Sequence, residues 1–264
     1  MGKATSINSK IRSLLQRPLE AIFLLGQIVV HLWRKQINFG NTIEQMGTVG
    51  PGSLPISLIT SASVGMVFTI QVARQFMEFG TIEIIGGITA IALSRELTPV
   101  LTAVVVAGRI GSSFAAEIGT MKVTEQIDAL YTLKTDPINY LVLPRFIACC
   151  LMLPMLTMVS FVAGIASGML IAENLYGVSQ TVFLDSVQNF LQVWDLIAAQ
   201  IKSVIFGSIV AIIGCNWGLT TSGGAKGVGE STTSAVVTAL TLIFVTNFFL
   251  SWLMFQGSGS DPLS

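Results

Sequence analysis

Three charged residues lie inside stretches of sequence that are otherwise apolar. Arg95 and Glu96 are neighbours in a run over residues 84–107, and Lys202 lies in a second run over residues 196–219. A lone charge in the middle of a membrane span costs about 2.5–3.5 kcal/mol on insertion scales, so such residues normally face a protein interior or a wet cavity and pair there. We therefore expect Glu96 and Lys202 to interact between helices, near a substrate path or as a purely structural ion pair.

The composition is that of a polytopic membrane protein. Of the 264 residues, 52% are hydrophobic and only 11% are charged, with a mean hydropathy of +0.75. A soluble domain carries about 25% charged residues. The formal net charge is zero, so charge gives no reason to expect a nucleic-acid partner.

The apolar runs predict an all-α membrane protein with a single domain over residues 1–264. A basic amphipathic segment at 9–37 is too short in its apolar part to span. It is expected to lie on the cytoplasmic membrane surface, or else to pack on other subunits. Five transmembrane helices are expected, at 53–73, 84–107, 141–172, 196–219 and 235–255. The segments 47–55 and 222–232 are rich in glycine or proline and predict a linker and a flexible loop.

The distribution of basic residues predicts the orientation. With the N-terminus in the cytoplasm and five spans, nearly all lysines and arginines outside the spans fall on the cytoplasmic side. Arg74, at the end of the first span, is the exception, and the outside segments are otherwise acidic. The C-terminus is then expected outside.

The cytoplasmic segment between the second and third spans has the pattern of a short amphipathic helix. Thr124 is expected to cap it, with Glu125 and Gln126 in its first turn. Such a helix suits contact with a partner protein, although a solvated loop that caps the bundle remains an alternative. The polar residues expected to make the contact are Glu117, Lys122, Thr124, Glu125, Gln126 and Asp128.

Motifs for chemistry are missing, so no enzyme is expected. The sequence contains no G-x-x-x-x-G-K-[ST] run, and Lys226 in the glycine-rich segment is followed by glycine. A single histidine cannot build an imidazole metal site. Cys149, Cys150 and Cys215 have no metal-type spacing and are expected to be inert. No cofactor is expected in this chain.

Several sequence motifs are long enough to indicate a family resemblance. They include Leu93-Ser-Arg-Glu-Leu-Thr-Pro-Val100, Ala107-Gly-Arg-Ile-Gly111, Ala115-Ala-Glu-Ile-Gly-Thr-Met121 and Thr124-Glu-Gln-Ile-Asp-Ala-Leu130. In these motifs, and over most of its length, the chain resembles the MlaE family, the permease subunits of lipid-transporting ABC systems.

The resemblance implies a homodimer with five spans per chain and an N-terminal interfacial helix. It implies partnership with an ABC ATPase that binds ATP and Mg²⁺, with MCE-domain substrate-binding proteins, and with phospholipid or a related lipid. It places the coupling segment at about Gly111–Leu130 and the family's intramembrane charged pair on Glu96 and Lys202. The lipid pocket is expected to include Met66, Val67 and Ile70.

Two other classes of function stay open on the residues alone. One is an ion-coupled secondary carrier that uses Glu96 and Lys202, and the other is a structural membrane anchor for an outside assembly. The expected location is a bacterial inner membrane, with a plastid inner envelope as the alternative. The N-terminus does not resemble a transit peptide, which favours a bacterial or plastid-encoded origin.

Overall fold

The computed structural model describes residues 20–21, 23–28, 30–31, 33 and 38–255 of the chain. The described residues are helical almost throughout, and none of them lies in a strand. This confirms the all-α prediction. Within the predicted interfacial segment, the described positions between 20 and 33 are helical; the remainder of 9–37 lies outside the described residues.

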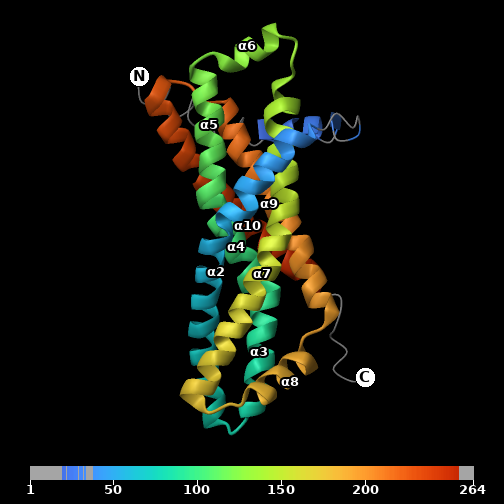
Figure 1. Cartoon of the computed structure of the whole chain (residues 1–264), viewed down its shortest axis with the longest axis vertical. Coiled ribbons are helices and arrows are strands. Elements are labelled where there is room, and N and C mark those ends of the chain that lie inside the picture. Colours follow the sequence, from blue (N-terminus) through green and yellow to red (C-terminus); the bar gives the residue numbers. More distant parts are fainter. Residues whose placement is uncertain (1–19, 22, 29, 32, 34–37, 256–264) are drawn as a thin grey trace, which may run out of the picture. The chain divides into compact units, whose positions relative to one another are not determined.

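Five helical segments are long and apolar enough to cross a membrane, as the sequence predicts: Phe39–Glu78, Ile82–Val123, Ile138–Tyr176, Val193–Leu219 and Gly224–Phe255. The first is α2, the fourth α9 and the fifth α10. The second joins η1 (Ile82–Ile84), α3 (Ile85–Ala92), η2 (Leu93–Leu97), α4 (Thr98–Val106), η3 (Ala107–Gly111) and α5 (Ser112–Val123); the third joins η4 (Ile138–Val142) and α7 (Leu143–Tyr176). Two shorter helices, α6 (Gln126–Thr132) and α8 (Gln180–Phe190), lie in the connections (Figure 1).

The chain divides into two compact units. Of the described residues, one unit comprises those before 46 together with 107–148 and 208–239, and the other comprises 46–106, 149–207 and 240–255. The first unit contains the segments predicted to be cytoplasmic, α6 among them, and the second contains the segments predicted to be outside, α8 among them. The side of the membrane on which each unit lies stays a prediction.

Glycines allow α2 and α7 to pack closely within the second unit. A Cβ on Gly65 would collide with the backbone of Gly164, and one on Gly168 would lie 2.6 Å from Thr69 Oγ1. Ser61 Oγ donates to the Ser160 carbonyl at 2.6 Å across the same contact. The two glycines of α7 are four residues apart, which is the small-xxx-small spacing that brings helices together in membranes.

The amphipathic helix α8 packs against α3 in the second unit (Figure 1). Ser186 Oγ accepts from the Gly87 backbone N–H at 2.9 Å, and Phe183 is almost fully buried. A Cβ on Gly86 would collide with the Phe183 carbonyl oxygen. Here too a glycine, which has no side chain, allows the two helices to approach closely.

Two predicted connections are wrong. Residues 47–55 do not form a linker but lie inside α2, with Pro51 and Pro55 in the helix. Without water to satisfy the backbone, a continuous helix is favoured even where a proline removes one hydrogen bond. The glycine-rich segment 222–232 is also mostly helical, because α10 begins at Gly224. Thr221 Oγ1 donates to Ser231 Oγ at 2.9 Å and holds the start of α10 to the end of α9.

Candidate functional site

The charged residues of the second span lie on an irregular turn. Arg95 and Glu96 belong to η2, a π-helical turn between α3 and α4, and such turns occur frequently at functional sites. Pro99 lies four residues after Arg95 and has no N–H to donate back to the Arg95 carbonyl. That oxygen is therefore available, and Lys202 Nζ donates to it at 2.6 Å.

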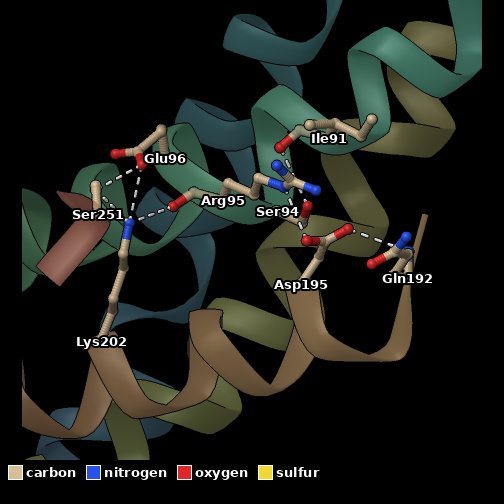
Figure 2. A network of polar contacts seen from close by, with 8 residues as sticks. All are labelled: Ile91, Ser94, Arg95, Glu96, Gln192, Asp195, Lys202 and Ser251. Carbon is tan, nitrogen blue, oxygen red and sulfur yellow. Dashed lines mark hydrogen bonds and ion pairs between the residues drawn. The ribbon is translucent and has the colours of Figure 1, made fainter. Parts of the chain in front are cut away.

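Glu96 and Lys202 are in contact, as the sequence predicts. Lys202 is fully buried, and its Nζ lies 3.0 Å from Glu96 Oε1 and 2.8 Å from Ser251 Oγ. With the Arg95 carbonyl, these acceptors use all three ammonium hydrogens. Glu96 also accepts from Ser251 Oγ at 2.6 Å and from Asn247 Nδ2 at 2.7 Å. Figure 2 shows the lysine and the carboxylate pointing toward each other with Ser251 beside them.

Arg95 belongs to a second ion pair, with Asp195 in the first turn of α9. Arg95 Nε lies 2.8 Å from Asp195 Oδ1, and the aspartate side chain is fully buried (Figure 2). The other carboxylate oxygen accepts from the Gln192 backbone N–H at 3.1 Å. The Arg95 guanidinium also lies 4.6 Å from the centre of the Phe255 ring, within the range of a cation–π contact.

The two ion pairs form one network of formal charge zero. Asp195 and Lys202 are seven residues apart on α9, which is two helical turns, so they lie on the same face. Asn247 and Ser251 are four residues apart on α10 and likewise share a face. We call Arg95, Glu96, Asp195, Lys202, Asn247 and Ser251 the charge network. It joins the η2 turn, α9 and α10 within the second unit.

Half of this network was not predicted from the sequence. Asp195 lies just before the predicted fourth span, which was expected to begin at residue 196, whereas α9 begins at Val193. The seven-residue spacing between Asp195 and Lys202 was a usable signal. Asn247 and Ser251 gave a weaker one, as polar residues in an apolar run, and nothing pointed to Phe255.

The predicted coupling residues lie in the first unit, in the second half of α5, in the turn that follows it and at the start of α6. Thr124 does not cap α6, so that prediction is wrong. Its backbone is not extended, as an N-cap requires, and its hydroxyl donates back to the Thr120 carbonyl at 2.8 Å. The residue before α6 is Glu125, in the left-handed conformation with φ 61°. Gln126 then begins α6, and both side chains are exposed.

Two ion pairs hold this region. Lys122 Nζ lies 3.3 Å from Asp128 Oδ1 across the turn between α5 and α6, at the surface. Glu117 Oε2 accepts from Arg145 at 2.8 Å, and the Arg145 side chain is only 8% exposed. Arg145 also donates to the Leu141 carbonyl at 2.8 Å. The arginine therefore fixes α5, which leads into α6, to the beginning of α7.

The predicted lipid-pocket residues are only partly brought together. A pocket of about 610 Å³ lies against the C-terminal half of α2, and Ile70 lines it. Met66 and Val67 are not among its lining residues, and Val67 is 55% exposed.

A helical chain with five candidate spans and a charge network of zero net charge among them is a polytopic membrane protein. The family model described as Permease MlaE matches residues 42–253. The chain belongs to the MlaE permease family and is an ABC transporter permease, a transport subunit and not an enzyme.

Three relatives illustrate the family. The chain is 62% identical to the probable ABC transporter permease protein slr1045 of Synechocystis, over 94% of each chain. It is 51% identical to the chloroplastic protein Trigalactosyldiacylglycerol 1 of Arabidopsis thaliana, over 93% of this chain and 70% of the relative. It is 48% identical to the probable ABC transporter permease protein ycf63 of Pyropia yezoensis, over 96% of each.

Proposed function

We propose that this chain is the membrane subunit of an ABC transporter that moves phospholipid or a related lipid between membranes. The observation that carries the proposal is the 51% identity to a relative that is named for a glycolipid, trigalactosyldiacylglycerol. The largely apolar pocket beside α2 supports it, because its volume lies in the range of small-molecule sites.

Energy comes in this proposal from a separate ATPase subunit that binds ATP with Mg²⁺. The contact with that subunit is made by α6, through the exposed Gln126 and Asp128 with Glu125 beside them. Support comes from the Glu117–Arg145 ion pair at 2.8 Å, which fixes α5 to the start of α7. A push on α6 therefore reaches two helices rather than one flexible loop.

The working unit is a homodimer that also engages an MCE-domain protein on the outside. The exposed apolar surface of α10 supports the dimer. Large apolar side chains on this helix, such as Phe244, Phe248 and Trp252, are more than half exposed in the single chain. The location is a bacterial inner membrane or, equally, a plastid inner envelope, because the relatives come from a cyanobacterium and from plastid-bearing organisms.

In this mechanism the charge network holds three helical segments together. Its hydrogen bonds connect η2 to α9 and α10, and the network as a whole carries no net charge. An ion-coupled carrier would instead need Glu96 to gain and lose a proton during transport. Its side chain is 42% exposed, so this second candidate is tested with the first.

The test begins with purification of the tagged chain from native membranes in mild detergent and identification of what stays bound. We expect a stoichiometric ABC ATPase, an MCE-domain protein and phospholipid. Asp128→Arg on α6 should remove the ATPase, because it reverses the charge on the proposed contact surface. Asp185→Arg on α8 is the matched control: it makes the same change on an exposed residue of the other predicted side and should leave the ATPase bound.

Transport is then measured in proteoliposomes that contain the purified complex. The proposal requires lipid transfer that depends on ATP hydrolysis. A folded chain that binds no ATPase, and moves its substrate when a proton gradient is applied, would overturn it in favour of the ion-coupled carrier.

A further inference from the structure

The pocket beside α2 has one polar wall with a positive charge. Gln71, Arg74 and Gln75 line it together with apolar side chains that include Phe68, Phe76 and Ile88. Gln71, Arg74 and Gln75 are spaced i, i+3 and i+4, so they share one face of α2. One guanidinium and two carboxamides are thus offered to the same pocket, whereas the other lining side chains are apolar.

Arg74 differs from the other basic residues of the second unit. Among the described residues of that unit, Arg95 and Lys202 are the remaining cations, and each has a carboxylate partner. The Arg74 guanidinium makes no ion pair with a described residue, although Glu78 lies one helical turn away. Arg74 is exposed and is the basic residue that breaks the charge asymmetry of the predicted outside segments.

We propose that this pocket selects lipids whose headgroup has a net negative charge, carried by one phosphodiester or one sulfonate with no cation beside it. Arg74 binds the anionic oxygens, since its planar fork of N–H groups matches their geometry. Gln71 and Gln75 donate to the remaining headgroup oxygens, while Phe68, Phe76 and Ile88 contact the glycerol and the start of the acyl chains. The inference rests on the proposed lipid transport and narrows its substrate from lipids in general to anionic lipids.

The competing explanation is an arginine that extends to the membrane surface and contacts any lipid phosphate there. Such a residue would not discriminate between phosphatidylglycerol and phosphatidylcholine, because both contain a phosphate. The pocket is expected to discriminate between them. Its single cation is suited to a headgroup with net negative charge, and a choline group would add a second cation beside Arg74. Neutral galactolipids offer hydroxyls but no charge.

The experiment measures saturable lipid binding to the purified full-length protein in detergent. The probes are a short-chain phosphatidylglycerol and a sulfonated diacylglycerol glycolipid, against a short-chain phosphatidylcholine and a digalactosyl diacylglycerol. We expect both anionic lipids to bind about tenfold more tightly than the other two, the scale of one charge-assisted interaction. A preference for only one anionic lipid would identify which headgroup, phosphate or sulfonate, the site takes.

Three variants test whether Arg74 causes the preference for anionic lipids. Arg74→Gln should abolish it, whereas Arg74→Lys should keep most of it. Lys226→Gln is the matched control, because it removes one exposed positive charge from the other unit and should change nothing. Since Arg74 is exposed, unchanged thermal unfolding is expected for all three. Equal binding of all four lipids, or a preference that survives Arg74→Gln, would refute this inference and leave lipid transport standing; saturable binding of none of the lipids would refute both.

Discussion

Separate removal of the two partners of the Glu96–Lys202 pair should have unequal effects. Glu96→Gln leaves the ammonium of Lys202 in a site where its side chain is fully buried. A buried charge that loses its partner costs about 3–5 kcal/mol. Because the Arg95 carbonyl and Ser251 still accept from Lys202, we expect the low end, a loss of about 3 kcal/mol in the free energy of unfolding.

Lys202→Met leaves a carboxylate that is better placed to stand alone. The Glu96 side chain is 42% exposed and keeps the hydrogen bonds from Ser251 and Asn247. The expected loss is about 1–2 kcal/mol, the cost of one unmade hydrogen bond to a charged group. The double variant contains neither charge and should lose only about 2 kcal/mol, so the two changes should be less than additive by about 2–3 kcal/mol.

The unfolding free energies come from denaturant titration of the purified protein in detergent, and transport is measured on the same four proteins in proteoliposomes. Changes that add to within about 0.5 kcal/mol would refute the reasoning, because residues in direct contact must couple. If the double variant is stable but does not transport, the pair serves transport. If it is stable and transports normally, the ion pair is purely structural.

Two further predictions follow from a close backbone contact and from the buried arginine, Arg145. Gly86→Ala should destabilise the protein by about 1–3 kcal/mol and raise hydrogen exchange in α8, because its Cβ would collide with Phe183; Gly229→Ala, on a helix face with open space, should be neutral or slightly stabilising. Glu117→Gln should cost more stability in denaturant titration than Arg145→Met, since the arginine is 8% exposed and the glutamate 48%; the reverse order would contradict the burial argument.

The sequence was sufficient for the fold class and for the central contact of the site. Long apolar runs predict five spans because a bilayer sets their length, and a lone charge in a span demands a partner. Glu96 and Lys202 were the simplest pair to satisfy that demand, and they are in contact. The roles proposed for them, and for α6, stay predictions.

The errors have physical causes that local patterns do not contain. Thr124 and Glu125 are both compatible with a helix start, and the choice depends on where α5 ends, which packing decides. Glu125 adopts a left-handed conformation that is costly for a residue with a Cβ. Pro51 and Pro55 predict a break in water, but α2 continues through them.

Balance of charge explains how four ionised groups can persist in these helices. All three ammonium hydrogens of Lys202 are donated in hydrogen bonds, and both oxygens of Asp195 and of Glu96 accept hydrogen bonds. The network therefore carries no net charge and its carboxylates leave no oxygen unpaired, so removal of a single member costs more than removal of a pair. Loss of transport in a single variant would thus report destabilisation and mechanism together. Only the paired variant, which removes the charge and the penalty at once, separates a network that holds the helices from one that also participates in lipid movement.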